Sequence, residues 1–260
     1  MKSPIKWAGG KSWLAPTIGA IYQRYRDRRF VEPFCGSCAV TLALKPDNAL
    51  CADSLWPLIN FFKYLKEGGE IAAKEPLTEA KYYRVRSDFN RLPKFGQRSF
   101  DDEPVRKLAE YFYLLNRSGF NGLYRVNTSG GFNVPWGRYK SGVPGVVGCA
   151  HELKNIRFAC QSWEETIGCC TDDFIYSDPP YDDGFTDYTE NSFGWYQQVL
   201  LAAYLAGHHG PVVASNKATP RIVALYKGVG FKVQYVSGPR RIACNGNRKP
   251  EREILATKNL

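Results

Sequence analysis

The sequence predicts an α/β fold built on a mainly parallel sheet, with a second lobe inserted into it. Short apolar, β-branched runs recur along the chain, and segments with helical spacing of apolar residues separate several of them. Strands that alternate with helices favour a parallel sheet whose two faces are both covered. Residues 56–144 differ, because they carry no strong buried-strand run before Gly122 and are rich in Arg, Tyr and Asn. A chain of 260 residues is long enough for one sizeable core and a smaller lobe.

Each element of this fold has a local signal. A strand-sized apolar run bounded by Gly, Pro, Asn or Asp is typical of a buried strand. Apolar residues at helical spacing predict a helix around residues 105–115, and another helix is expected to begin near Ala39. A Gly-rich hairpin is expected from Gly122 onward. We therefore expect one domain formed by residues 1–55 and 145–260 and a second formed by residues 56–144. The six predicted strands are Arg29–Phe34, Ala49–Asp53, Asp173–Ser177, Pro211–Ser215, Phe231–Val236 and Glu253–Thr257.

Composition indicates a packed globular protein of the cytosol. Apolar residues make up 44% of the chain and aromatic residues 14%. No apolar run approaches the ~20 residues needed to span a bilayer. The segment Met1–Lys11 has no hydrophobic stretch that could act as a signal peptide. Without an export signal, the eight cysteines are expected to be mostly reduced and partly buried, as for Cys51 and Cys160.

The charge balance favours a polyanionic partner. The formal net charge is +10, and a basic protein gains affinity for nucleic acid as neutralised phosphates release counterions. Basic residues cluster around residues 81–91, 117–140 and 240–252, where aromatic residues and asparagines interleave with them. That mixture is typical of surfaces that contact bases as well as phosphates. Charge alone leaves open a basic surface that serves only solubility.

The first candidate binding motif follows the first predicted strand. Phe34-Cys35-Gly36-Ser37-Cys38 is a glycine turn between this strand and the helix expected near Ala39. A strand, a glycine turn and a helix place backbone N–H groups beside a ligand. Asp53 ends the next strand, where a carboxylate can accept hydrogen bonds from ribose hydroxyls of a nucleoside cofactor. One glycine and a distant Asp also fit many other α/β turns.

The strongest candidate for chemistry is Asp178-Pro179-Pro180-Tyr181, directly after a predicted strand. The prolines fix the backbone and remove two N–H donors, which leaves carbonyls as acceptors. The Asp178 side chain and the Pro179 carbonyl could each accept one N6–H of an adenine, while Tyr181 stacks on its ring. Two such acceptors would localise the N6 lone pair and stabilise positive charge developing on nitrogen. The alternative is a tight turn with a structural role.

The segment Lys6–Lys11 contains Gly10-Lys11-Ser12, which resembles the end of a phosphate loop. The first glycine of that motif would fall at Ile5, and no strand precedes it, so the phosphate-loop interpretation fails. Trp7, small residues and a lysine instead predict a flexible segment that closes over a nucleoside and its carboxylate tail.

Residues 116–139 combine a hairpin pattern with base-contacting side chains. Asn121-Gly122 followed by a Gly-Gly turn predicts the hairpin. Its arginines and asparagines suit base edges and phosphates, and Phe120 is a candidate wedge between base pairs. The alternative, a solvated hairpin, would not need so many aromatic residues.

With these motifs in hand, the sequence resembles the Dam family of DNA adenine-N6 methyltransferases. The resemblance covers nearly the whole chain, and the motifs fall in the family order. The segments that carry it are Lys6–Lys11, Val31–Phe34 with Gly36, Asp53, Leu115–Tyr139, Asp178–Tyr181, Phe185-Thr186 with Tyr188, Ser215-Asn216, Arg240-Arg241 with Asn245, and Arg248-Lys249.

The resemblance implies a seven-stranded, mostly parallel, Rossmann-like methyltransferase sheet with an inserted helical and hairpin DNA-recognition lobe. It implies transfer of a methyl group from S-adenosylmethionine to N6 of an adenine that is flipped out of double-stranded DNA, at GATC. We accordingly expect a cytoplasmic monomer, associated with nucleoid or viral DNA, that needs neither metal nor membrane.

The resemblance also implies roles for individual residues. Lys6 would help to read the first base pair of GATC and Arg125 a guanine further along, while Phe120 would fill the gap left by the flipped adenine. Leu123 and Pro135 would pack against bases or a thymine methyl, and Asn127 and Arg138 would hold the backbone or the edge of the site, with Arg117 and Asn121 as further DNA contacts. The catalytic set is Asp178, Pro179, Pro180 and Tyr181. The expected cofactor contacts are Trp7, Ala8, Gly9, Lys11, Glu32, Phe34, Cys35, Gly36, Asp53, Ser162, Trp163 and Asp178.

The chain also departs from the family pattern. Cys38 stands where a second glycine is usual, and its Cβ and sulfur are expected to crowd the methionine end of the cofactor. Cys35-x-x-Cys38 also fits a redox or metal pair, but no second ligand pair stands at zinc spacing and the resemblance explains the loop better. Phe120 replaces a common tyrosine, and 182–184 is short and acidic. Two alternatives stay open: a DNA-binding scaffold whose cofactor site Cys38 has impaired, and an RNA adenine methyltransferase. The hairpin favours DNA.

Overall fold

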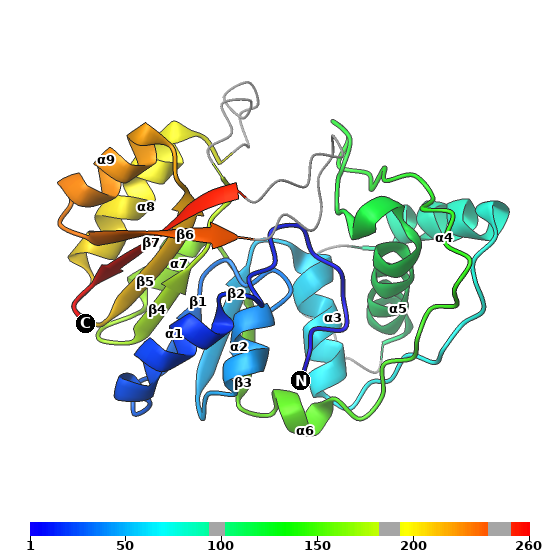
Figure 1. Cartoon of the computed structure of the whole chain (residues 1–260). Coiled ribbons are helices and arrows are strands. Elements are labelled where there is room, and N and C mark those ends of the chain that lie inside the picture. Colours follow the sequence, from blue (N-terminus) through cyan, green and yellow to red (C-terminus); the bar gives the residue numbers. More distant parts are fainter. Residues whose placement is uncertain (94–101, 182–192, 239–250) are drawn as a thin grey trace. The chain divides into compact units, whose positions relative to one another are not determined.

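The structure, a computed structural model, describes residues 1–93, 102–181, 193–238 and 251–260 (Figure 1). Its centre is a seven-stranded sheet in the order β3-β2-β1-β4-β5-β7-β6. β1 pairs in parallel with β2 and β4, and β4 pairs in parallel with β5. β7 runs antiparallel to both β5 and β6. The predicted mostly parallel α/β sheet of seven strands is therefore confirmed. The strands are β1 (Phe30–Glu32), β2 (Ala49–Asp53), β3 (Ile156–Cys160), β4 (Phe174–Ser177), β5 (Val212–Lys217), β6 (Lys232–Gly238) and β7 (Glu251–Lys258).

All six strands predicted from the sequence are present, with ends that differ by at most two residues. β3 was missed, because it is an edge strand whose apolar run is interrupted by the charged, exposed Arg157. Cys160 at its end is exposed, which corrects the expectation that it is partly buried. The seven cysteines in the described part of the chain are free thiols.

Helices separate most of the strands along the chain. The predicted helix around residues 105–115 is present as α5, and the helix expected near Ala39 begins at that residue as α2. No helix in the described part of the chain is long and apolar enough to span a membrane. The α-helices are α1 (Ala15–Tyr22), α2 (Ala39–Leu44), α3 (Trp56–Lys66), α4 (Glu79–Arg91), α5 (Glu103–Ser118), α6 (Ala150–Leu153), α7 (Trp163–Gly168), α8 (Trp195–Gly207) and α9 (Pro220–Gly228), and the 3₁₀ turns are η1 (Gln23–Tyr25) and η2 (Phe120–Gly122).

The chain forms two compact units. One comprises Met1–Gly10 with Leu55–Cys160, and the other comprises Lys11–Ser54 with Gln161–Leu260. The assignment of residues 56–144 to a recognition domain, and of 1–55 with 145–260 to a catalytic domain, stays a prediction.

The second unit, Lys11–Ser54 with Gln161–Leu260, is built around central strands that are buried on both faces. Every residue of β1 and β4 is buried, and successive side chains of a strand point to opposite faces. Phe30 stacks on Phe174 with ring centroids 5.5 Å apart, and Tyr22 packs edge-on against both rings. These aromatic contacts hold α1 against the two central strands, at whose carboxyl ends the candidate catalytic motifs begin.

The first unit, Met1–Gly10 with Leu55–Cys160, packs α3 against α5. Phe61 stacks on Tyr113 at 5.7 Å, and the buried Asn60 amide donates to the Val105 carbonyl over 3.0 Å. The buried Tyr82 hydroxyl of α4 donates to the Val134 carbonyl over 2.9 Å, which anchors the loop that follows α5.

The predicted hairpin is present within this loop as isolated antiparallel bridges. Val126 faces Phe132, and the chain reverses through a turn in which Gly130 has a positive φ of 76°. Asn121-Gly122 is not a hairpin turn. It forms η2, with positive φ at both residues.

Candidate active site

The Asp178 carboxylate lies just beyond the end of β4 and is held at both of its oxygens. Lys11 Nζ lies 3.0 Å from Oδ2, and the Ser215 hydroxyl of β5 donates to Oδ1 over 2.8 Å. The Tyr176 hydroxyl lies 2.9 Å from the Ser215 hydroxyl, in the buried interior of the sheet. Because parallel strands end at the same edge of a sheet, β4 and β5 bring these groups together. One carboxylate orientation is thereby fixed.

A buried cation balances this carboxylate. Lys11 is only 4% exposed, and its Nζ also lies 3.9 Å from an oxygen of the buried Glu253. Burial raises the pKa of Asp178 above its ordinary value, and the neighbouring Lys11 opposes that rise. The same ammonium lies 4.8 Å from the centroid of the Tyr181 ring, within cation–π range. Lys11, Asp178 and Tyr181, all predicted site residues, are thus brought together.

The glycine turn after β1 is closed by the acid at the end of β2. The Gly36 amide donates to Asp53 Oδ2 over 3.1 Å, and the Cys35 amide donates to the Ala52 carbonyl over 2.9 Å. Gly36 has a φ of 44°, a conformation that glycine adopts without steric cost. Asp53 is half-buried. The turn and the acid are therefore in direct contact, and their binding of a nucleoside stays a prediction.

Glu32 and Cys38 support this turn from inside the unit. The Glu32 carboxylate accepts hydrogen bonds from the Thr41 hydroxyl and, over 3.4 Å, from the Thr41 amide in the first turn of α2. Burial raises the pKa of Glu32 well above its ordinary range. Cys38 has a φ of 52° and is fully buried, with its sulfur 3.9 Å from the Gly36 carbonyl oxygen. Whether its side chain crowds a cofactor stays a prediction.

Two aromatic rings flank the same turn. Phe34 and Trp163 have ring centroids 6.4 Å apart and planes inclined by 26°, so their faces are turned toward each other. Trp163 opens α7, and Ser162 caps that helix by accepting from the Glu165 amide over 3.2 Å. Phe193 packs edge-on against both rings, with centroids 5.4 Å from Phe34 and 6.4 Å from Trp163, so the three form one aromatic cluster.

In the first unit, the N-terminal segment is bound to the loop after α5. The Asn116 side chain accepts from the Lys6 amide over 2.8 Å and donates to the Lys6 carbonyl over 2.7 Å. Lys6 Nζ lies 3.8 Å from the centroid of the Tyr139 ring and 3.4 Å from the Arg117 carbonyl oxygen. Gly122 has a φ of 65°, and a Cβ at this position would lie 2.4 Å from Lys6 Cβ. Lys6 is therefore positioned next to the predicted DNA-contacting loop.

The remaining predicted DNA contacts lie along that loop. Arg125 is exposed, and its Nε donates to the Asn133 side chain over 2.8 Å. Asn127 accepts from the Gly131 amide over 2.8 Å, which shapes the hairpin turn. The Phe120 side chain is 45% exposed, so it is accessible to a partner, and its role as a wedge stays a prediction. Pro135 and Arg138 are exposed, and Asn121 and Leu123 are half-buried.

Some predicted residues are not brought into either cluster. Trp7, Ala8 and Gly9 belong to the first unit, whereas Lys11 belongs to the second. Further residues named by the resemblance, together with the acidic stretch 182–184, lie outside the described part of the chain: Phe185, Thr186, Tyr188, Arg240, Arg241, Asn245, Arg248 and Lys249.

Sequence reasoning missed Tyr176, Gln198 and Glu253 as parts of the site. Tyr176 and Glu253 sit in predicted strands without a motif of their own, although a charged residue in a buried strand is a usable signal. Gln198 donates to the Pro180 carbonyl over 2.8 Å from α8, and no local signal marks it.

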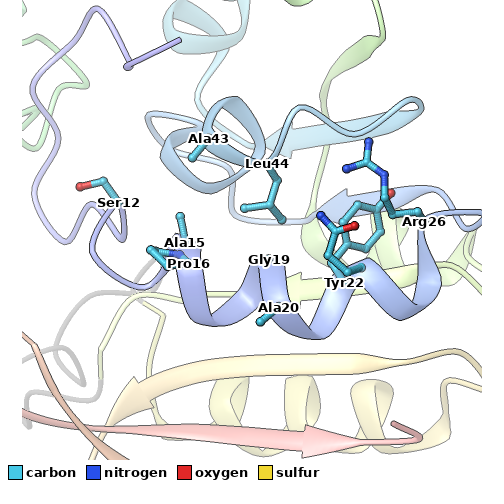
Figure 2. Close-up of a pocket in the computed structure, with 10 residues that line it drawn as sticks. Ser12, Ala15, Pro16, Gly19, Ala20, Tyr22, Arg26, Ala43 and Leu44 are labelled. Carbon is cyan, nitrogen blue, oxygen red and sulfur yellow. The ribbon is translucent and has the colours of Figure 1, made fainter.

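Two other features of the described residues, possible metal ligands and a pocket between α1 and α2, bear on where the site lies. Within the described ranges, no group of three or more His, Cys, Asp or Glu side chains is arranged to hold a metal ion. A pocket of about 440 Å³ lies between α1 and α2, lined largely by small and apolar residues such as Ala15, Gly19 and Leu44 (Figure 2). None of the predicted site residues lines it.

Comparison with known proteins identifies the family. Residues 7–242 match the family of D12 class N6 adenine-specific DNA methyltransferases. The chain is 36% identical to a DNA adenine methylase of Vibrio cholerae, over 97% of this chain and 94% of that protein. It is 33% identical to the retron Ec67 DNA adenine methylase of Escherichia coli, over 98% and 91%, and 32% identical to the DNA adenine methylase of Escherichia coli K12, over 97% and 93%. The family match covers most of the chain, and it includes both Asp178 after β4 and the buried Lys11 that pairs with it. This chain therefore belongs to the D12 class of N6 adenine-specific DNA methyltransferases.

Proposed function

We propose that this enzyme transfers a methyl group from S-adenosylmethionine to N6 of adenine in double-stranded DNA, within the sequence GATC. The observation that carries the proposal is the Asp178 carboxylate, held between Lys11 Nζ and the Ser215 hydroxyl at the start of a diproline turn. The residues 56–144 would recognise the target, and the residues 1–55 and 145–260 would carry out the transfer.

Asp178 would act as a hydrogen-bond acceptor for the target amine. The N6 lone pair of adenine is delocalised into the ring, so the amine is a poor nucleophile. One N6–H donated to Asp178 and one to the Pro179 carbonyl would draw the nitrogen toward tetrahedral geometry. Each carboxylate oxygen has two acceptor positions, so the bonds from Lys11 and Ser215 leave room for this contact. Tyr181 would stack on the adenine face.

The residues around the glycine turn fit S-adenosylmethionine. The half-buried Asp53 carboxylate stands where ribose hydroxyls can donate to it, and Gly36 lets a ligand approach the backbone closely. Phe34 and Trp163 lie beside this turn, and their aromatic cluster would give the cofactor adenine an apolar surface to pack against. When bound, the cofactor supplies the electrophilic methyl of its sulfonium group. The protein residues align the adenine amine with that methyl and keep Asp178 in its accepting form.

Recognition of GATC is proposed for Lys6 and Arg125. Lys6 is pre-positioned by Asn116 and by the face of Tyr139. Arginine and lysine donate to guanine O6 and N7, which makes them suited to the outer base pairs of this sequence. The relatives named as DNA adenine methylases support adenine as the target base. Flipping that adenine out of the stack would cost a few kcal/mol, which phosphate and base contacts would offset.

The test measures transfer of labelled methyl from S-adenosylmethionine to matched duplexes that contain GATC or a permuted sequence, followed by identification of the modified base. We expect N6-methyladenine only in the GATC duplex. Methylation spread over other adenines would overturn the proposed recognition roles. No methylation, despite specific DNA binding, would favour a scaffold whose cofactor site Cys38 has impaired, and preferential methylation of structured RNA would overturn the DNA target.

The variant Asp178→Ala tests the catalytic assignment. We expect it to lose methyl transfer while it keeps specific binding to the GATC duplex, because the loop that carries Lys6 and Arg125 is unchanged. Wild-type methylation by this variant would remove Asp178 from the mechanism.

A further inference from the structure

Three hydrogen bonds connect the backbone of β5 to the catalytic turn through two buried amides. The Lys217 amide donates to Asn216 Oδ1 over 2.8 Å, and Asn216 Nδ2 donates to Gln198 Oε1 over 2.9 Å. Gln198 Nε2 then donates to the Pro180 carbonyl over 2.8 Å. Both amide side chains are fully buried, at 0% exposure. Burying two amides is unfavourable unless their groups are bonded, so this chain of contacts is costly to disrupt.

The first bond determines the orientation of the other two. Because Asn216 Oδ1 accepts from a backbone N–H, its Nδ2 must face Gln198. Gln198 must then present its oxygen to Asn216 and its N–H to Pro180. A reversed Gln198 amide would set oxygen against the Pro180 carbonyl and N–H against N–H. The donor at Pro180 is therefore held in one orientation by β5, and aligned bonds of this kind strengthen one another.

This donor acts on the part of the turn that the prolines leave free. The rings fix φ at Pro179 and Pro180, and each proline also restricts ψ of the residue before it, so ψ of Pro180 is the main remaining freedom of the turn. Holding the Pro180 carbonyl fixes the peptide plane that leads into Tyr181. The Pro179 carbonyl has no donor among the described residues, so it is the one left to accept from a substrate amine.

We propose that Gln198 is a positioning residue for methyl transfer, which holds the diproline turn in place, and with it the Pro179 carbonyl and the Tyr181 ring, through its bond to Pro180. It touches neither the amine nor the methyl group. The proposal rests on the proposed function, because it needs the diproline turn to hold the adenine. It predicts an effect on the transfer step rather than on binding of DNA or cofactor.

Two variants test this role. Gln198→Leu keeps a similar volume and removes the donor. Its single-turnover rate with saturating GATC duplex and S-adenosylmethionine should fall by roughly 10- to 100-fold, as expected for a loss of alignment. Its dissociation constants for DNA and cofactor should change less than about three-fold, on the same reasoning. The neighbouring substitution Gln197→Leu, on the same helix, serves as the matched control and should leave the rate unchanged.

Gln198→Glu provides a readout that a merely structural role would not move. The introduced carboxylate can still accept from Asn216, but it offers the Pro180 carbonyl a donor only when protonated. The ratio of wild-type to variant rate should therefore shrink as the pH is lowered. The test follows how the rate of Gln198→Glu, relative to wild type, changes with pH. It therefore stays informative even if Gln198→Leu folds poorly.

Three results would decide the matter. The positioning role would be overturned if Gln198→Leu had the wild-type single-turnover rate, or if its binding of DNA or cofactor fell as much as its rate. It would also be overturned if the ratio of wild-type to Gln198→Glu rate did not change with pH. If the wild-type enzyme itself did not methylate adenine, the proposed function would fail instead. The two failures are therefore distinguishable in the same set of assays.

Discussion

Replacing Lys11 with Met tests the electrostatic account of the site. The substitution keeps an unbranched side chain of similar length but removes the cation that lies 3.0 Å from Asp178 and 3.9 Å from Glu253. At 3.0 Å the attraction between the two charges is about 5.5 kcal/mol for an effective dielectric of ~20, before desolvation is subtracted. Breaking a buried pair typically costs 3–5 kcal/mol. In the variant, Asp178 keeps its bond to Ser215, and its side chain is 19% exposed. We therefore expect Lys11→Met to lower the free energy of unfolding by the lower end of this range, about 3 kcal/mol near pH 8.

The dependence on pH has a definite sign. Burial already raises the pKa of Asp178 in the folded protein, so its ionisation costs stability as the pH rises through that folded pKa, and Lys11 limits the cost. Without Lys11 the folded pKa of Asp178 rises further. A protonated carboxyl needs no cation. The difference in free energy of unfolding between wild type and Lys11→Met, called the stability gap below, should therefore be largest at alkaline pH. It should decrease by about 1 kcal/mol or more when the pH is lowered to about 5.

Urea unfolding followed by tryptophan fluorescence at about pH 5, 7 and 8 measures this gap. The control is Lys232→Met on the exposed side of β6, which should change the free energy of unfolding by less than about 0.5 kcal/mol. A gap that stays constant with pH, or one no larger than the control's, would refute the assignment of Lys11 as the counter-ion of Asp178. The activity of the variant should also recover partly as the pH rises, because more Asp178 becomes ionised and able to accept from N6.

Three further substitutions test other parts of the structure. At Cys38, with a φ of 52°, Cys38→Gly should be more stable than Cys38→Ala by about 1 kcal/mol in urea unfolding, because glycine relieves left-handed strain; the reverse order would contradict it. Gly122→Ala should weaken binding of a GATC duplex at least ten-fold, on the order of 1.4 kcal/mol, by displacing Lys6, as titration by fluorescence anisotropy would show. Gly148→Ala, with a φ of 66° but nothing within 4 Å of a new Cβ, should leave DNA binding intact; equal binding losses in both would remove Lys6 from recognition. Tyr82→Phe removes the bond to the Val134 carbonyl and should lower the free energy of unfolding by about 0.5–1.5 kcal/mol, whereas no loss would show that this bond adds nothing to stability.

The sequence by itself determined the fold class and the identity of the main motifs. Each predicted strand is a short apolar run between turn residues, and α5 repeats its apolar residues with helical spacing, so local patterns were enough. The Asp178–Tyr181 turn was recognisable because its residue types already suggest a rigid set of acceptors. The edge strand β3 escaped this reasoning, because the exposed Arg157 interrupts its apolar pattern.

Only the tertiary structure decided which side chains contact Asp178 and its turn. Lys11 and Ser215 bind the carboxylate, Glu253 lies near Lys11, and Gln198 binds the Pro180 carbonyl, although these residues are far apart in the chain. Local periodicity reports whether a residue lies on a buried face, but it carries no information on which strand becomes its neighbour. That pairing depends on the order β4-β5-β7, in which β7 inserts antiparallel beside β5 and brings the Glu253 carboxylate near Lys11. The acceptor groups of the turn are determined by four consecutive residues, whereas its charge balance and its rigidity arise from contacts between residues far apart in the chain.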